Sequence, residues 1–221
     1  MRPYSPRFAE HYWSPAGGVT EKQVVFLAGN QLPARWGTLA PESTFTVAEL
    51  GFGTGLNFAL TAAEFIATAP VTTKLVYLGY EAYPLPLGEL LAIHQTLPVA
   101  LHPWLQQLAD AWPQPQPGWQ TVAWGRVILQ LWIGTAASGV THQPQPADAW
   151  YLDGFSPAKN PDLWSLPLLQ QVAAHSNPGA TVATYSVARM VRDNLTAAGF
   201  TVQKRAGVPP KRDRLEGQLR A

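Results

Sequence analysis

Three glycines on alternate positions, Gly51, Gly53 and Gly55, form the stretch of this 221-residue sequence best suited to bind a ligand. An apolar run that ends in Glu49 precedes them, and a segment with helical apolar periodicity begins at Leu56. Glycine permits a positive φ and close approach of backbone N–H groups to a ligand, and a helix N-terminus adds unpaired donors. The stretch therefore predicts a strand, a tight turn and a helix that cradle a nucleotide-type cofactor. A strand–helix turn without any ligand has the same pattern.

The glycine spacing helps to distinguish between cofactors. The dinucleotide fingerprint G-x-G-x-x-G needs a third glycine at the position where Leu56 stands. Glu49, two residues before the first glycine, would repel a pyrophosphate but suits a cationic ligand. S-adenosylmethionine carries an ammonium and a sulfonium, and its carboxylate can meet the amides of the glycine turn. These residues favour S-adenosylmethionine over NAD, and an NAD(P)-dependent oxidoreductase is the alternative.

Two further carboxylates end predicted strands. Residues 74–81 end in Glu81, which is placed to accept hydrogen bonds from ribose hydroxyls, or else to cap the next helix. Residues 147–153 end in Asp153, which could orient an incoming amine and accept its proton, or could be a structural cap. Asp153 is therefore the candidate catalytic residue.

The residues after Asp153 admit two chemistries. Ser156 resembles a nucleophile in an elbow turn, but the next residue, Pro157, lacks the N–H that would stabilise an oxyanion. Phe155 and the rigid Pro157 instead suit an apolar wall for a stacked base. The segment therefore favours substrate binding over serine catalysis.

The predicted elements alternate between strands and helices, which indicates an α/β fold with a doubly wound, mostly parallel sheet and an antiparallel C-terminal edge. Strands are expected at residues 24–27, 45–50, 74–81, 119–124, 127–133, 147–153, 180–185, 200–204 and 215–219, and helices from residue 56 and at 87–97, 101–111, 163–176 and 187–198. Residues 1–23, 33–44 and 138–146 are expected to be irregular, residues 178–179 to form a turn, and the alternating prolines of 113–118 to be extended. Parallel strands end at one edge of a sheet, so Glu49, Glu81 and Asp153 should meet there. Residues 1–221 are predicted to form one domain, with residues 1–37 as a leader packed on or over the cofactor site.

Composition excludes several classes of site. The sequence has no cysteine, so disulfides and thiolate chemistry are absent, and its five histidines lack metal-ligand spacing. No apolar run is long enough to span a membrane, and the N-terminus does not have the pattern of a signal peptide. We therefore expect a cytoplasmic protein that binds neither metal nor membrane.

A basic cluster near the C-terminus is the strongest charge feature, in a chain whose net charge is only +1. It comprises Lys204, Arg205, Lys211, Arg212 and Arg214, and Lys159 could join it in space. Such a run is commonly a solvated face, but several phosphate contacts would also give salt-sensitive RNA affinity.

Several segments match a known family. They are Ser5-Pro6-Arg7-Phe8, residues 25–32 (VFLAGNQL), residues 49–58 (ELGFGTGLNF), residues 148–164 (DAWYLDGFSPAKNPDLW), residues 197–205 (AAGFTVQKR) and Lys211-Arg212. On these motifs the chain resembles the methyltransferase that completes 5-methylaminomethyl-2-thiouridine at the tRNA wobble position. In some bacteria that enzyme is the N-terminal half of a bifunctional protein fused to an FAD-dependent oxidase.

The resemblance implies a class I, Rossmann-like methyltransferase, S-adenosyl-L-methionine as donor and the aminomethyl group of uridine 34 in tRNA as acceptor. It implies that the glycine turn, Glu49 and Asn57 hold the methionine moiety, that Glu81 holds the ribose, and that Asp153 lies at the transfer site. Phe155, Pro157, Lys159, Lys211 and Arg212 would contact the RNA. The oxidase half has no counterpart in these residues, so a stand-alone form is expected.

Two positions depart from the family. Thr135 stands where the family has an acid near the adenine amino group, and its hydroxyl can accept a hydrogen bond only without charge assistance. Residues 208–210 (VPP) replace the usual glycine-and-basic approach to Lys211 and Arg212. A catalytically silent Rossmann-like RNA-binding module is therefore a second alternative.

Overall fold

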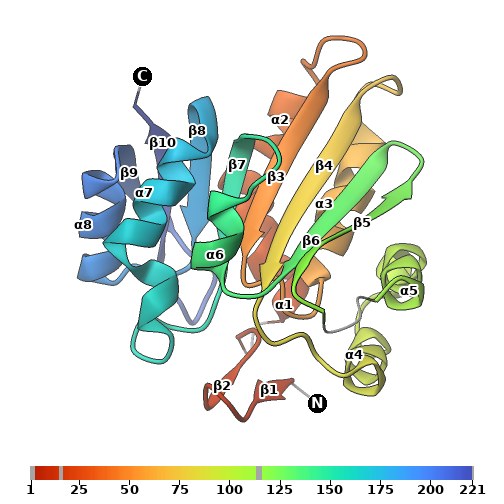
Figure 1. Ribbon diagram of the computed structural model, residues 1–221, viewed down its shortest axis with the longest axis horizontal. Helices are drawn as coiled ribbons and strands as arrows, with labels where there is room; N and C mark the ends of the chain where they lie inside the picture. Colours follow the sequence, from red (N-terminus) through yellow and green to blue (C-terminus); the bar gives the residue numbers. More distant parts are fainter. Residues whose placement is uncertain (1–2, 15–16, 113–115, 221) are drawn as a thin grey trace.

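The computed structural model describes residues 3–14, 17–112 and 116–220, and its centre is an eight-stranded sheet (Figure 1). From one edge to the other its strands are β5 (Gly118–Trp124), β6 (Val127–Ile133), β4 (Lys74–Glu81), β3 (Thr44–Leu50), β7 (Ala147–Leu152), β8 (Ser176–Thr184), β10 (Asp213–Leu219) and β9 (Phe200–Ala206). The five strands from β6 to β8 are parallel, β5 is antiparallel to β6, and β10 is antiparallel to both of its neighbours. This arrangement confirms the predicted fold class, including the antiparallel C-terminal side.

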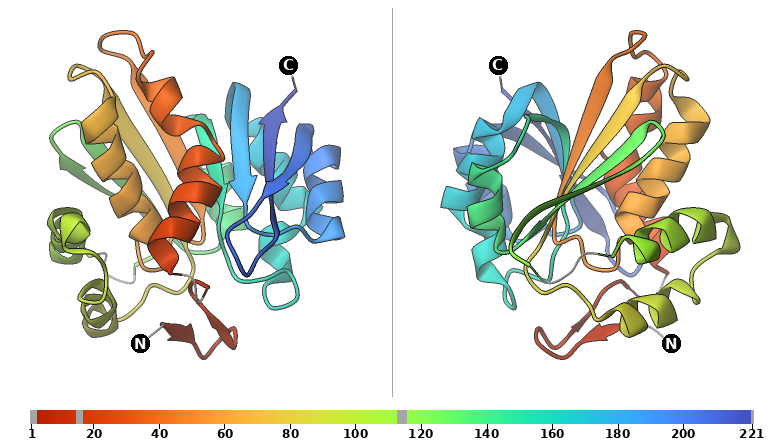
Figure 2. Two further views of the ribbon diagram at one scale, coloured as in Figure 1. Left: turned by 180° about the vertical axis from the view of Figure 1, so that it is seen from behind. Right: turned by 45° about the vertical axis from the view of Figure 1, so that its right-hand side comes forward.

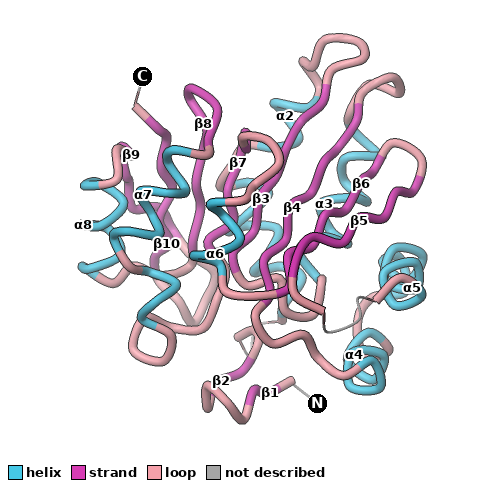
Figure 3. Tube along the Cα trace, in the orientation of Figure 1, coloured by secondary structure: helices cyan, strands magenta, loops and turns pink. Residues whose placement is uncertain are grey.

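Helices cover both faces of the sheet (Figure 2). On one face lie α1 (Gly18–Lys22) with its π-helical continuation η1 (Gln23–Ala28), α2 (Leu32–Trp36) and α3 (Leu56–Thr68); on the other lie α6 (Ala136–Thr141), α7 (Leu166–Ala174) and α8 (Arg189–Ala197). α4 (Leu87–His94) packs on α5 (His102–Asp110), which packs on α3, and the 3-10 turns η2 (Val99–Leu101) and η3 (Pro161–Trp164) precede α5 and α7. A separate two-stranded sheet, β1 (Tyr4–Ser5) and β2 (Glu10–His11), lies near the carboxyl ends of the parallel strands (Figure 3).

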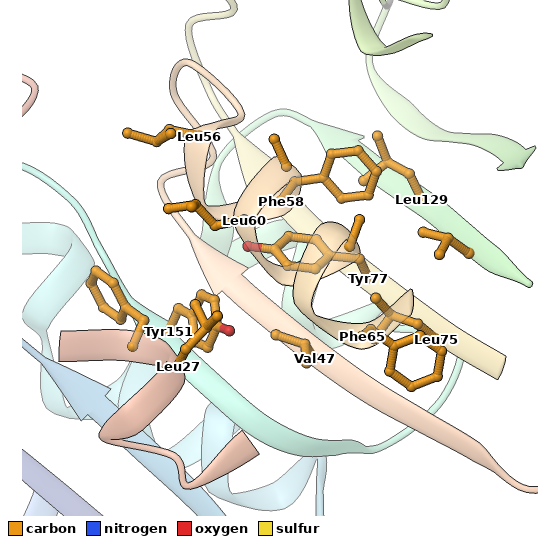
Figure 4. Packing of buried hydrophobic residues seen from close by; sticks show 14 of the residues in the cluster. Leu27, Val47, Leu56, Phe58, Leu60, Phe65, Leu75, Tyr77, Leu129 and Tyr151 are labelled. Carbon is orange, nitrogen blue, oxygen red and sulfur yellow. The ribbon is translucent and has the colours of Figure 1, made fainter. Parts of the chain in front are cut away.

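The central strands place alternate side chains in two separate cores. Val47, Tyr77 and Tyr151 are fully buried on the α3 face, where Figure 4 shows them with Phe58 and Phe65 of α3. Burying each such side chain contributes about 1.5–3 kcal/mol of transfer free energy. The same two-residue period carries Glu49, Glu81 and Asp153 to the α3 face at the strand ends, because each follows its inward-facing neighbours by two or four positions.

The N-terminal region differs most from the prediction. Residues 24–27 are helical, as part of η1, and not a strand, and α2 occupies the beginning of the predicted loop 33–44. Val25, Phe26 and Leu27 are all buried, and a short apolar run of this kind suits a buried helix as well as a strand. The supposedly irregular residues 1–23 contain β1, β2 and α1.

Other secondary-structure boundaries also differ from the prediction. The predicted turn at residues 178–179 lies inside β8, and α6 takes up the first part of the predicted loop 138–146. The hairpin of β5 and β6, with its two-residue turn, is confirmed. Residues 113–115 of the proline-rich stretch lie outside the described residues. Within the described residues, no helix has the length and apolarity to cross a membrane.

Candidate functional site

The glycine turn joins β3 to α3 and has the predicted backbone conformation. Gly51, Gly53 and Gly55 have φ of 82°, 55° and 72°. A Cβ on Gly51 would lie 2.0 Å from the carbonyl oxygen of Asp153, and one on Gly55 would lie 2.2 Å from the Leu108 side chain. The absence of a side chain at Gly51 and Gly55 therefore lets the turn pack closely against Asp153 and Leu108.

Four of the amides expected to meet the carboxylate of the ligand already donate hydrogen bonds within the protein. The N–H groups of Gly51 and Phe52 both donate to the Tyr80 carbonyl at 3.0 Å, and that of Gly55 donates to the Phe52 carbonyl at 3.0 Å. The Gly53 N–H donates to Oε2 of Glu81 at 2.7 Å. The turn closes against the end of β4, which supplies the acceptors for Gly51, Phe52 and Gly53, and the Gly55 N–H is satisfied within the turn itself.

Glu49 lies beneath the turn in a chain of side-chain hydrogen bonds. It is only 1% exposed, and its oxygens accept from Nδ2 of Asn57 and from the Tyr77 hydroxyl, the latter at 2.7 Å. Asn57 Nδ2 also donates to Oδ2 of Asp153 at 2.8 Å. The same Oδ2 accepts from the ammonium of Lys22, which forms an ion pair with Asp153. The Asn57 amide thus links the Glu49 and Asp153 carboxylates, and the Lys22 ammonium ends this row of hydrogen bonds.

Burial raises the pKa of both acids, and nearby charges add to this rise at one and oppose it at the other. Burial raises the pKa of Glu49 well above its ordinary value, and the nearby charge of Asp153 adds to that rise. Burial also raises the pKa of Asp153, while the charge and hydrogen bond of Lys22 act to lower it. Two carboxylates that share one amide favour a proton on one of them, and the Lys22 ammonium opposes that.

Glu81 bridges the ends of two loops. Its Oε2 accepts from Gly53, and its Oε1 accepts from the Tyr83 N–H at 2.8 Å. Burial raises the pKa of Glu81, and the backbone donors act against this rise. The carboxylate therefore fixes the position of the glycine turn relative to the end of β4.

A cavity of about 850 Å³ opens over the carboxyl ends of the parallel strands. Gly51, Gly53, Glu81, Thr135 and Asp153 all contribute to its wall. Six carboxylates and three lysine or arginine side chains of the described residues line it, so its charge favours a cation. A volume of this size and a position at the strand ends are typical of ligand sites in open α/β sheets.

Residues before α1 form one side of this cavity. Phe8 stacks on Phe155, with ring centroids 4.5 Å apart, and Tyr12 meets Phe155 edge to face. Glu10 of β2 accepts from both the N–H and the hydroxyl of Ser156 at 2.9 Å. The loop after β7 is therefore held by the N-terminal segment, and one face of Phe155 is already covered.

Some of the other predicted residues line a cavity, and some do not. Glu49 and Asn57 line a small cavity of about 30 Å³ that also borders Asp153, while Lys211 lines the large one. Thr135 caps α6 by accepting from the Ser138 N–H at 3.3 Å. Four predicted residues do not contribute to either cavity wall as described: Gly55, Pro157, Lys159 and Arg212.

Sequence reasoning missed four residues that line the same cavity as Asp153: Glu10, Glu21, Lys22 and Tyr185. Lys22 pairs with Asp153, and Lys211 Nζ lies 2.7 Å from Oε1 of Glu21 and 3.6 Å from the centre of the Tyr185 ring. Glu10 holds the loop after β7. The only available signal was a pair of adjacent charges, Glu21 and Lys22, beside an apolar run, and that pattern also fits an exposed helix end.

The chain has relatives among known proteins. A family model described as S-adenosyl-L-methionine-dependent methyltransferase matches residues 99–220. Two relatives are called tRNA 5-methylaminomethyl-2-thiouridine biosynthesis bifunctional protein MnmC. The one from Nitrosospira multiformis is 44% identical over 98% of this chain and 35% of its own length, and the one from Magnetococcus marinus is 42% identical over 98% and 32%. The chain thus spans about a third of the length of these relatives.

A solved structure supports the fold independently. The crystal structure of MnmC2 from Aquifex aeolicus superposes with a TM-score of 0.81 at 23% identity, over 97% of this chain and 65% of that one. The family match agrees with the preference for S-adenosyl-L-methionine over NAD that the glycine spacing had indicated. The family model covers more than half of the sequence, and the chain belongs to this family of S-adenosyl-L-methionine-dependent methyltransferases.

Proposed function

We propose that this protein transfers a methyl group from S-adenosyl-L-methionine to the aminomethyl nitrogen of 5-aminomethyl-2-thiouridine at the tRNA wobble position. The observation that carries the proposal is the Asp153 carboxylate at the cavity wall. Its Oδ2 is held by Lys22 and Asn57, whereas Oδ1 accepts no hydrogen bond from the described residues. The names of the MnmC relatives supply the substrate class.

The residues of the cavity suit the donor. Its excess of carboxylates favours a ligand with ammonium and sulfonium charges. Oδ1 of Asn57 is buried and has no partner among the described residues, so it is available to a donor ammonium. Glu81 is placed for ribose hydroxyls, and Glu49 would act through Asn57 because both of its oxygens are already engaged. Bound there, S-adenosyl-L-methionine would supply an electrophilic methyl group to a neutral primary amine.

Asp153 orients the acceptor amine and accepts its proton. Its Oδ1 accepts an N–H of the amine, which turns the nitrogen lone pair away from the carboxylate and fixes the direction of attack. The proton that the nitrogen loses goes to the same oxygen. Phe8, Tyr12 and Phe155 form an aromatic side of the cavity that suits a stacked base.

The N-terminal residues and the basic side chains complete the proposal. Residues 1–37 would belong to the same domain as the sheet and cover the donor, since residues 4–8, 10–14 and 21–22 contribute to the cavity wall. Lys159 and Arg212 are exposed and would contact tRNA phosphates together with Lys211 and Pro157.

The test uses tRNA that carries aminomethyluridine, tritiated donor and nucleoside analysis of the product. We expect wild-type protein to form methylaminomethyluridine, and Asp153→Asn to retain binding of S-adenosylhomocysteine but lose at least about 100-fold in rate. Asp110→Asn, an exposed acid on α5, is the matched control and should keep wild-type activity. Binding of the tRNA without any transfer by wild-type protein would instead support a silent RNA-binding module.

A further inference from the structure

The buried lysine beside Asp153 is the feature that the proposed reaction leaves unexplained. Lys22 ends α1, and its side chain is 7% exposed. It makes its only ion pair among the described residues with Asp153, 131 positions along the chain, and its ammonium lies 5.2 Å from the centre of the Phe26 ring. The cost of desolvating a buried lysine largely offsets what its contacts with one carboxylate and one ring contribute to folding. Stability therefore does not explain why a lysine lies here.

We infer that Lys22 is a positioning residue for methyl transfer, which holds Asp153 ionised and turned so that Oδ1 faces the acceptor amine. The inference rests on the proposed function. It follows from the geometry: Lys22 and Asn57 both donate to Oδ2, so two donors fix the carboxylate plane and leave the other oxygen for the substrate.

The charge of Lys22 matters because Asp153 is not alone. Glu49 shares the amide of Asn57 with Asp153, and both acids are buried. Two buried acids this close favour one proton between them, and the Lys22 ammonium bound to Asp153 directs that proton to Glu49. Without this cation Asp153 would compete for the proton, and a protonated Asp153 could neither accept the amine N–H at full strength nor take up its proton.

The other titratable groups around Asp153 do not replace this cation. Those that face it are Glu21 of α1, Glu49 of β3, Tyr77 of β4, Tyr185 after β8 and Lys211 of the β9–β10 connection. Lys211 is the only other cation among them, and it is paired with Glu21 at 2.7 Å. Burial acts to raise the pKa of Glu21, but hydrogen bonds from Lys211 and Ser14 outweigh it and the pKa is lowered, so the pair persists as two charges that largely cancel.

The experiment compares Lys22→Met, Lys22→Gln and Lys22→Arg with wild-type protein across a range of pH. The readout is kcat/KM for methyl transfer to tRNA carrying aminomethyluridine. In Lys22→Met and Lys22→Gln we expect the acidic limb of the profile to move up by about one to three pH units, since an opposite charge at this distance changes a carboxyl pKa by that amount. Lys22→Arg keeps the charge and should keep the wild-type limb.

A second readout does not need the reaction. The carboxyl ¹³C resonance of Asp153, assigned by its loss in Asp153→Asn, should titrate at higher pH in Lys22→Gln than in wild-type protein. An unchanged titration, or a wild-type acidic limb in Lys22→Gln, would overturn the inference. If one neutral variant fails to fold, the other decides. The two proposals fail differently: absence of transfer by wild-type protein rejects the proposed function, whereas active wild type with unresponsive Lys22 variants rejects only the role of Lys22.

Discussion

Replacing Gly51 by alanine should destabilise the protein through a contact with Asp153, which directly follows β7. The new Cβ would lie 2.0 Å from the carbonyl oxygen of Asp153 and 3.1 Å from Cα of Gly154, so β3 and β7 would have to separate. The residue also has a φ of 82°, which L-residues adopt at a cost. Strain of about 1–2 kcal/mol and overpacking of about 1–3 kcal/mol give an expected loss of about 2–5 kcal/mol. That is a large share of a total stability of about 5–15 kcal/mol.

Urea denaturation measures this loss, and Gly53→Ala is the matched control. Gly53 has a φ of 55°, but its Cβ would lie 3.3 Å from an edge atom of the Tyr12 ring, a side chain that can move. The control should therefore lose only the backbone term, about 1–2 kcal/mol. Because Asp153 moves with its carbonyl, Gly51→Ala should also lower methyl transfer on the order of 100-fold. Equal stability of the two variants would refute the reasoning from the strand contact.

Two further substitutions test other parts of the structure. Because burial raises the pKa of Glu49, the folded state keeps a proton that the unfolded state has lost, and stability should fall as pH rises from the ordinary carboxyl value toward the raised one. Glu49→Gln should remove this fall, by up to about 1.4 kcal/mol per pH unit, as measured by urea denaturation at a series of pH values. Arg126 donates to the carbonyls of Pro70, Ile66 and Ala69 at the end of α3, at 2.8, 3.1 and 3.2 Å. Arg126→Met should cost about 2–4 kcal/mol in thermal unfolding, and Arg126→Lys less; no change would contradict the capping role.

The sheet and the acids at its edge were predictable because both follow from local patterns. The alternation along residues 45–50 and 74–81 determines which side chains face α3, and parallel strands bring their ends together. Once Glu49 and Asp153 were assigned to strand ends, their proximity followed from the fold class alone. The three glycines likewise permitted the positive φ that each of them has.

What could not be predicted depends on contacts between distant segments. Lys22 meets Asp153 across 131 positions, and no local pattern distinguishes a lysine that will be buried from one that will be solvated. The glycine spacing gave the backbone conformation of Gly51 but not the strand that a side chain there would strike. The four-residue apolar run at 24–27 predicts that these side chains are buried, but it does not distinguish a helix from a strand, because both fit so short a segment.

The position of β10 between β8 and β9 has a consequence for the order of assembly. β9 precedes β10 in the chain, but among the described strands it pairs with β10 alone, so β9 cannot join the growing sheet by itself. The short connection of residues 207–212 lets the two strands pair with each other at little loop-closure cost. We expect this hairpin to form first and to dock on β8 as a unit, so that this half of the sheet is completed in one step instead of strand by strand.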